Sequence, residues 1–118
     1  MSFQKKEIFT NVKNLEEELK TNPGFIVMKF GAEWCGPCKK IEEQVNTLMS
    51  KTNSNVKCYM VDVDENFETY AFLKSKKMVN KIPAILFWKK GNITYIPDGV
   101  VIGSDATEIN IFFEKNIL

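Results

Sequence analysis

The chain has 118 residues, of which 44% are hydrophobic and 26% are charged, a balance that excludes a disordered protein and suits a single domain over residues 1–118. Its formal net charge of +1 indicates no surface for polyanions such as nucleic acid. The chain has no histidine and all 16 basic residues are lysines, which excludes imidazole catalysis, imidazole metal ligands and guanidinium recognition of phosphate.

The first half of the chain shows alternating strand and helix patterns. We expect a short strand near residues 6–9 and a strand over 25–28, where the run is almost wholly apolar and therefore suits burial on both faces of a sheet. One helix precedes the second strand and another begins near Cys35. Their apolar faces are formed by Val12, Leu15 and Leu19 in the first helix, and by Ile41, Val45, Leu48 and Met49 in the second.

The second half continues the alternation and ends in a hairpin and a helix. We expect strands over 56–63 and 84–88, a helix over 65–77, and a strand over 93–96 that pairs with the 84–88 strand after a turn at Gly91. A C-terminal helix is capped by Ser104 or Asp105 and has an apolar face of Ile109, Phe112, Phe113 and Ile117. This order predicts an α/β layer fold with a mixed central sheet.

The most informative segment is Trp34-Cys35-Gly36-Pro37-Cys38, which follows a predicted buried strand and begins a predicted helix. The positive end of a helix dipole lowers the pKa of a thiol there and favours the nucleophilic thiolate. The second sulfur lies one turn further along and can resolve a mixed disulfide formed at the first. Gly36 gives the loop freedom and Pro37 suits a first helical turn. We therefore expect Cys35 at the surface and Cys38 behind it.

Two other uses of the cysteine pair are weaker. A zinc site normally needs four cysteine or histidine ligands, and this chain has three cysteines. A purely structural disulfide across so short a loop adds little stability, because that effect grows with loop length. Redox chemistry is therefore favoured, and we expect no metal site.

The segment Ala32–Lys39 resembles the active site of the thioredoxin family, and the resemblance extends from about Lys6 to Leu118. Val61–Glu65 is similar to the family's third strand and the loop after it, and Phe87–Gly91 to a hairpin that follows. The resemblance implies a thioredoxin fold, with a mixed sheet of about five strands flanked by four helices. It also implies a dithiol–disulfide oxidoreductase.

Further site residues follow from the resemblance. Pro83 matches the family's cis-proline, which predicts a cis Ile82–Pro83 bond, although only about 5% of X-Pro bonds are cis in general. Ile82 is then expected to offer its main-chain N–H and C=O to an extended substrate. Gly99 is placed near the active site on the same ground. The alternative for Pro83 is an ordinary proline that opens an edge-like strand.

Lys29 departs from the family, most members of which carry a buried aspartate beneath the second cysteine. Burial lowers the pKa of a lysine, and a neighbouring carboxylate raises it. A charged Lys29 would favour the thiolates and make a weaker reductant, whereas a neutral Lys29 would accept the proton instead. Met60 stands where many members have a polar partner. The alternative is that Lys29 reaches solvent along its stem and has no chemical role.

Other departures concern the helices. Gly31 replaces a usual aromatic residue, and Glu43 stands where many members have a kinking proline, so we expect a straighter second helix. The interval from Asp64 to Pro83 is longer by about one helical turn, which predicts a longer third helix over 65–78. The lysines near its end are expected to form a solvated face, or else a docking patch for a partner: Lys74, Lys76, Lys77 and Lys81.

The remaining aromatic and sulfur side chains receive simpler interpretations. Cys58 lies in the middle of a strand and is expected to be buried and inert, the alternatives being intermolecular pairing or a regulatory thiol. Trp34 is expected to shield the site and contact substrate. Trp88 is expected to pack in the core, and Glu33 to be an exposed flank.

We conclude from the sequence that the protein is a protein-disulfide reductase that acts through Cys35 and Cys38. It needs no bound cofactor, and its electrons come from an NADPH-dependent thioredoxin reductase or another thiol donor. The main alternative is a dedicated subunit of a secretory or protein-translocation complex that acts on cargo disulfides. A redox-inert binding module with a static disulfide is a third reading.

The location is also an expectation. No stretch reaches the roughly 18 apolar residues that a membrane span needs, and the first residues lack the apolar core of a signal peptide. We expect a cytoplasmic protein with no membrane span and no nucleic-acid partner. A secretory or extracellular vacuolar compartment is the alternative if a leader is removed from the mature protein.

Overall fold

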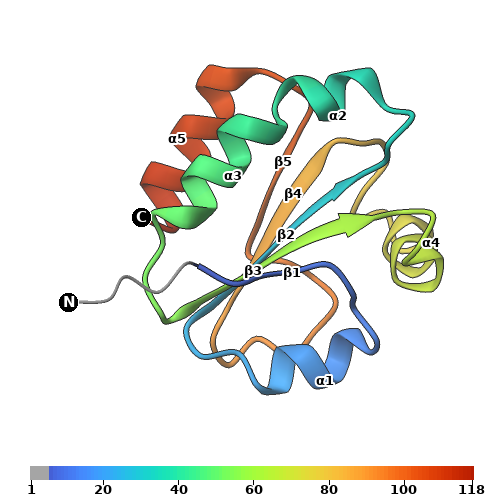
Figure 1. Cartoon of the computed structure of the whole chain (residues 1–118). Coiled ribbons are helices and arrows are strands. Elements are labelled where there is room, and N and C mark those ends of the chain that lie inside the picture. The colour runs from blue at the N-terminus through green and yellow to red at the C-terminus, as the bar shows by residue number, and fades with distance from the viewer. Residues whose placement is uncertain (1–5) are drawn as a thin grey trace.

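The computed structural model describes residues 6–118. Strands and helices alternate along most of this length (Figure 1). In chain order they are β1 (Ile8–Phe9), α1 (Leu15–Lys20), β2 (Phe25–Gly31), α2 (Gly36–Lys40), α3 (Glu42–Ser50), β3 (Val56–Asp62), α4 (Phe67–Ser75), β4 (Ala84–Lys89), β5 (Gly99–Ile102) and α5 (Ala106–Asn116).

The five strands form one mixed sheet in the order β1-β3-β2-β4-β5. β1 and β2 both run parallel to β3, whereas β4 is antiparallel to β2 and β5 is antiparallel to β4. In the register of the central strands, Phe30 lies opposite Val61 on one side and Ala84 on the other. The mixed five-stranded sheet predicted from the sequence is confirmed.

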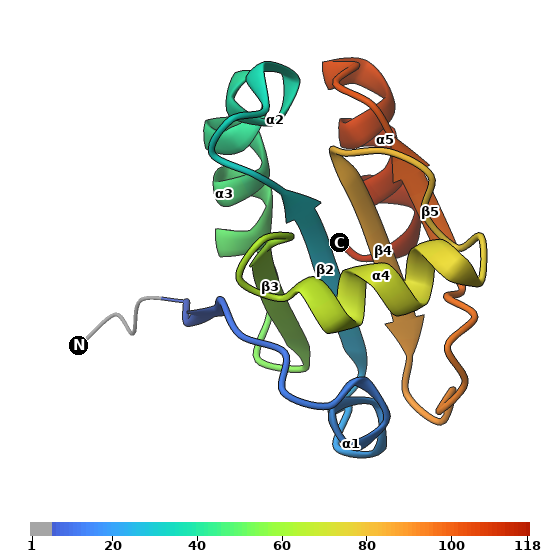
Figure 2. The same cartoon turned by 90° about the vertical axis from the view of Figure 1, so that its right-hand side faces the viewer.

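Helices cover both faces of the sheet: α2, α3 and α5 lie on one side, and α1 and α4 on the other (Figures 1 and 2). Alternate residues of β2 therefore enter different halves of the core. Ile26, Met28 and Phe30 pack with the α1 and α4 side chains, and Val27 packs with those of α3 and α5. Because side chains alternate along a strand, Lys29 projects to the same side as Val27.

The second helix is broken, contrary to the expectation that it runs straight. α2 ends at Lys40 and α3 begins at Glu42, and Ile41 between them has φ −105° and ψ 2°. The side chain of Ile41 is almost fully buried among the α3 and α5 side chains. The bend therefore occurs at a buried isoleucine and requires no proline at Glu43. Because of this break, residues 6–118 contain five helices where four were expected.

The third helix is shorter than predicted. α4 ends at Ser75, and the chain turns away at Lys77, which has a φ of 64°. The amide of Lys77 donates to Lys74 O and the amide of Met78 donates to Leu73 O, the paired bonds of a Schellman motif. The extra residues of this region therefore form the connection to Pro83 rather than another helical turn.

The predicted strand over 93–96 is wrong, because the partner of β4 is β5, beginning at Gly99. Residues 93–96 form an irregular loop held by side chains. The Asn92 side chain accepts from the Thr94 amide and donates to Ile96 O, and the Trp88 indole donates to Thr94 O. These side-chain bonds compete with strand pairing, so the alternation of Ile-Thr-Tyr-Ile does not produce a strand.

Small differences occur at other element ends. Val12 is buried but precedes α1, whose first turn is capped by the Asn14 side chain. In α5 the cap is Asp105, one of the two residues predicted, and its carboxylate accepts from the Glu108 amide.

Candidate active site

The cysteine pair lies where β2 passes into α2. Cys35 has extended backbone angles and is the N-cap residue of α2, and Pro37 falls in the first turn, where its missing N–H costs nothing. The amide of Cys38 donates to the Cys35 sulfur over 3.2 Å. A backbone N–H therefore points at the first sulfur, an arrangement that stabilises its thiolate.

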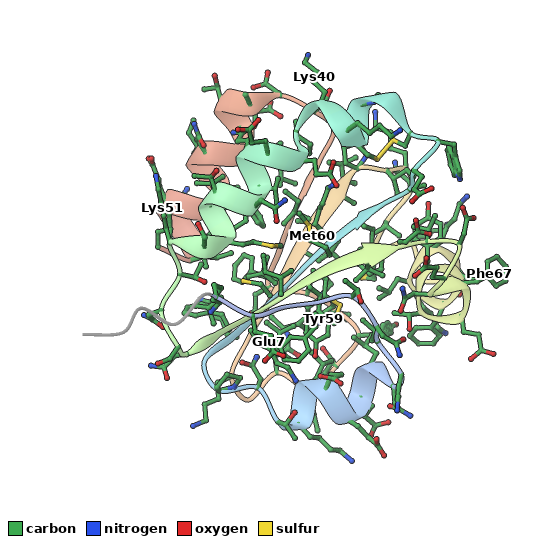
Figure 3. All side chains as sticks on the ribbon, viewed as in Figure 1. Glu7, Lys40, Lys51, Tyr59, Met60 and Phe67 are labelled. Atoms are coloured by element: carbon green, nitrogen blue, oxygen red, sulfur yellow. A yellow bond between two sulfur atoms is a disulfide. The ribbon has the colours of Figure 1, made fainter. Side chains whose placement is uncertain are left out.

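The two sulfurs are joined in a disulfide, with the Cα atoms 5.3 Å apart (Figure 3). Cys35 is 6% exposed and Cys38 is 2% exposed. Cys35 is thus the more accessible of the two, as expected, but it is less exposed than the sequence predicts. In the oxidised form, its side chain is turned back over the first turn of α2, toward Cys38 and its amide.

The orientation of Trp34 is fixed by Asp64, a residue just after the end of β3. Its side chain is 70% exposed, and its indole N–H donates to the Asp64 carboxylate over 2.8 Å. The large aromatic surface is therefore fixed in orientation yet open to a partner. Asp64 belongs to the Val61–Glu65 segment, but sequence reasoning did not assign it this role.

Ile82 and Pro83 immediately precede β4, and Ile82 packs against the core cluster that contains both cysteines. The peptide bond between them is cis, as the resemblance predicts. Pro83 is buried and leads into β4, and Ile82 is half-buried. Among the described residues, no hydrogen bond uses the main-chain N–H or C=O of Ile82.

The glycine near Pro83 is Gly103 and not Gly99. Gly99 lies opposite Phe87 at the far end of β5, where an added Cβ would lie 2.4 Å from the Phe87 ring. Gly103 follows the other end of β5, has a φ of 106°, and donates its amide to Pro83 O. Gly99 thus makes room for a core ring, and Gly103 is the residue that sequence reasoning missed.

A cavity of about 590 Å³ opens behind the second cysteine. Its wall includes Lys29, Gly31, Cys38, Glu42 and Met60, the last labelled in Figure 3. A Cβ on Gly31 would lie 3.4 Å from the Cys38 sulfur and 3.5 Å from the Lys29 Nζ. Gly31 therefore borders both the amine and the sulfur.

Lys29 is 6% exposed, and the structure gives it no salt bridge with another described residue. Burial lowers the pKa of its amine, and the negative charge of Glu42 acts in the opposite direction. Lys29 and Cys38 line the same cavity. Glu42 was not singled out from the sequence, because its place beside the cavity depends on the break at Ile41 between α2 and α3.

Cys58 is fully buried in β3, and its sulfur lies 3.7 Å from the Thr52 hydroxyl. Burial raises the pKa of this thiol, which keeps it protonated and unreactive. Within residues 6–118, no three His, Cys, Asp or Glu side chains are gathered as a metal site requires. No helix in this range is both long and apolar enough to cross a membrane.

Two lysines at the C-terminal end of α4 lie over aromatic rings. Lys74 Nζ is 5.8 Å from the centre of the Tyr70 ring, and Lys76 Nζ lies 5.8 Å and 5.6 Å from the ring centres of Phe72 and Tyr95. These two lysine side chains therefore pack against aromatic residues of the same chain. Phe67, at the start of α4, points away from the body of the protein (Figure 3).

Comparison with known proteins agrees with this geometry. The family model described as Thioredoxin matches residues 6–113. Thioredoxin of Bacillus subtilis is 36% identical over 74 residues, which cover 63% of this chain and 67% of that protein. Thioredoxin Asp f 29 of Aspergillus fumigatus is 35% identical over 86 residues, covering 72% of this chain and 74% of that protein.

Solved structures show the same fold. The crystal structure of a Plasmodium falciparum thioredoxin matches with a TM-score of 0.73 and 26% identity, and the match covers 99% of this chain and 93% of that one. Some relatives are longer: the match spans 41% of the chloroplastic thioredoxin M3 of rice. The chain belongs to the thioredoxin family of thiol–disulfide oxidoreductases, and the Cys35–Cys38 pair is its redox-active disulfide.

Proposed function

We propose that the protein reduces disulfide bonds of other proteins by exchange through Cys35 and Cys38. The Cys35 thiolate attacks one sulfur of the substrate disulfide, and that bond breaks as a mixed disulfide forms. The Cys38 thiolate then attacks the Cys35 sulfur and releases the substrate with both sulfurs reduced. Two electrons pass to the substrate, and the protein is left with the Cys35–Cys38 disulfide. The observation that carries the proposal is the bonded pair at the first turn of α2.

The proposed substrate surface surrounds the less buried sulfur. Ile82 has a main-chain N–H and C=O that no described residue uses, and an extended peptide can pair with them as a strand pairs with a sheet edge. Trp34 offers an exposed ring on the other side. Gly36 and Pro37 are exposed between them and leave the approach open. Pro83 shapes the backbone beside the sulfurs.

Oxidised protein must be reduced again before another turnover. We infer an NADPH-dependent thioredoxin reductase as the donor, because such enzymes commonly serve this family, or another thiol in its place. No bound cofactor is required, since the two cysteines carry both electrons. The cytoplasm is the proposed compartment, with a secretory or extracellular vacuolar location as the alternative.

The alternative of a dedicated subunit in a secretory or protein-translocation complex is not favoured. The relatives named above are called thioredoxins without reference to such a complex. The match of the family model covers residues 6–113, which include the motif segment. A general oxidoreductase therefore accounts for the comparisons more simply.

Lys29 is proposed to adjust the acidity of the cysteine pair. Its amine projects into the cavity that also contains Cys38. A positive charge there lowers the pKa of a nearby thiol, and loss of that charge raises it. The chain thus uses a cation where most of the family has a buried carboxylate.

The reduction of insulin disulfides with dithiothreitol as donor tests the function. Wild-type protein is expected to accelerate precipitation of the reduced insulin chain. Cys35→Ser should lose this acceleration, because no nucleophile remains, and Cys38→Ser should fall to a small fraction of it. Cys58→Ser is the matched control and should keep the activity, since Cys58 is buried away from the pair. Wild-type protein that adds nothing to the rate with dithiothreitol alone contradicts the proposal and favours a binding module.

A further inference from the structure

The cavity behind the disulfide brings together groups from three different elements. Lys29 comes from β2, Cys38 from α2, and Glu42 from the first turn of α3. Glu42 is exposed, whereas Lys29 and Cys38 are almost fully buried. The cavity therefore leads from the second sulfur, past a buried amine, to a carboxylate in contact with solvent.

The amine and the sulfur both lie next to Gly31. Both atoms lie within 3.5 Å of the point that a Gly31 Cβ would occupy, the sulfur at 3.4 Å and the amine at 3.5 Å. Met60 adds an apolar wall from β3, so it offers Lys29 no counter-charge. The usual polar partner on that strand is absent, and the compensating charge must come from another element.

The other charged groups of the cavity are less suited to this task. Lys39 repels a charged Lys29, and the Asp62 carboxylate already accepts from the amides of Asp64 and Glu65. The side chains of Glu33 and Glu65 complete the charged wall, and both belong to loops at its edge. The charge that acts on Lys29 against the effect of burial is that of Glu42.

We propose that Glu42 is the partner of Lys29, and that the two side chains together handle the proton that Cys38 loses when it resolves the mixed disulfide. The inference rests on the proposed function and extends it to a residue with no other assigned role. Most thioredoxins have a buried carboxylate at the position of Lys29. In this chain the central strand carries the cation, Lys29, and the carboxylate, Glu42, is on helix α3.

The step balances without any added oxidant or reductant. The Cys38 thiol gives its proton to solvent through the cavity, past Glu42, and the positive charge of Lys29 beside it stabilises the thiolate. The resulting thiolate attacks the Cys35 sulfur, the mixed disulfide bond breaks, and the substrate leaves as a thiolate. Glu42 is a positioning residue here, because it touches neither sulfur.

The test follows the resolution step by itself. A mixed disulfide is formed between Cys35 and 2-nitro-5-thiobenzoate, and the release of that chromophore by Cys38 is recorded by stopped flow between pH 5 and pH 10. Glu42→Gln removes a negative charge, so Lys29 and Cys38 should lose their first proton more easily. The midpoint of the pH profile is expected to fall by about half a pH unit.

Two controls isolate the pair. Glu43→Gln changes the neighbouring exposed carboxylate, which does not line the cavity, and should leave the profile in place. In a Lys29→Met background, Glu42→Gln should shift the profile by less than half as much, because its main target is gone. Glu42→Asp should restore most of the wild-type profile.

Titration of the Lys29 Cε signal by NMR supplies an independent readout and should show a lower Lys29 pKa in Glu42→Gln than in wild-type protein. An unchanged profile with Glu42→Gln, or an equal shift with and without Lys29, overturns the inference. Failure of wild-type protein in the insulin assay would instead refute the proposed function, so the two failures are distinguishable.

Discussion

At the scale of single residues, the chemistry depends on which groups surround each sulfur. The Cys35 sulfur accepts a backbone N–H and lies toward the exposed loop, whereas Cys38 is buried beside Lys29. The cysteine sulfur is thus a nucleophile at position 35 and is protected from solvent at position 38. Cys58, which is buried with its sulfur 3.7 Å from the Thr52 hydroxyl, has neither property.

Replacing Lys29 tests whether its charge reaches the attacking cysteine. In Lys29→Asp, a positive charge beneath the pair becomes negative, so the pKa of the Cys35 thiol should rise by more than about half a unit. The rate of iodoacetamide alkylation as a function of pH, measured on reduced protein, reports this value. Lys40→Asp carries the same change of charge on an exposed side chain and should shift it much less. Superimposable curves for wild-type protein and Lys29→Asp would leave Lys29 without a chemical role.

At the scale of elements, the end of α4 determines the path of the long segment between α4 and Pro83. Lys77 occupies the left-handed position of the Schellman motif after α4, where glycine is usual. A side chain at such a φ is strained, and this strain is present in the native protein only.

Lys77→Gly should therefore stabilise the protein. Relief of the left-handed strain exceeds the added backbone entropy of the unfolded chain, for an expected net gain of about 0.5–1 kcal/mol. Denaturant unfolding of oxidised protein measures it. Lys81→Gly, in the connection to Pro83, is the comparison that removes a lysine without this geometry. A Lys77→Gly protein no more stable than wild type would show that the turn is not strained.

At the scale of the whole molecule, the buried lysine links stability to pH. The pKa of Lys29 is lower in the folded protein than its ordinary value of 10.5. Between those two values the unfolded chain binds more protons than the folded one, so stability rises with pH in that window. Below the window, the fold bears the full cost of a buried charge.

Comparison with Lys29→Met isolates this effect. The variant should be more stable at neutral pH, and its advantage should shrink as pH rises toward 10.5, by at most about 1.4 kcal/mol for each pH unit. Urea unfolding at several pH values gives the difference. Contributions from Cys58 and Tyr59, whose raised pKa values act in the opposite direction at high pH, are common to both proteins and cancel. A difference that stays constant from pH 6 to pH 10.5 contradicts a lowered Lys29 pKa.

Much of this architecture is predictable because it follows from local patterns. The apolar runs that contain Val27 and Leu86 indicate buried strands, and the spacing of Cys35 and Cys38 indicates a redox pair at a helix start. The errors have non-local causes. The Trp88 indole donates a hydrogen bond to Thr94 O, which keeps residues 93–96 out of the sheet. Strand propensity does not predict such a contact between side chain and backbone.

The site shows the same division. The position of Lys29 beneath Cys38 follows from counting along β2, but its relation to Glu42 depends on how α3 packs against the sheet. Likewise, Gly103 reaches Pro83 only because β5 runs antiparallel to β4, starting at Gly99. One misplaced strand was enough to assign the wrong glycine.

Mapping of the trapped intermediate tests the central claim most directly. Reduced Cys38→Ser protein is mixed with a substrate that contains a disulfide, the reaction is stopped with acid, and the adduct is digested without reduction and sequenced by mass spectrometry. The account predicts a single intermolecular disulfide at Cys35, which disappears in the Cys35→Ser, Cys38→Ser double variant and persists when Cys58 is also replaced. An adduct located at Cys58, or one that forms equally well without Cys35, would contradict it.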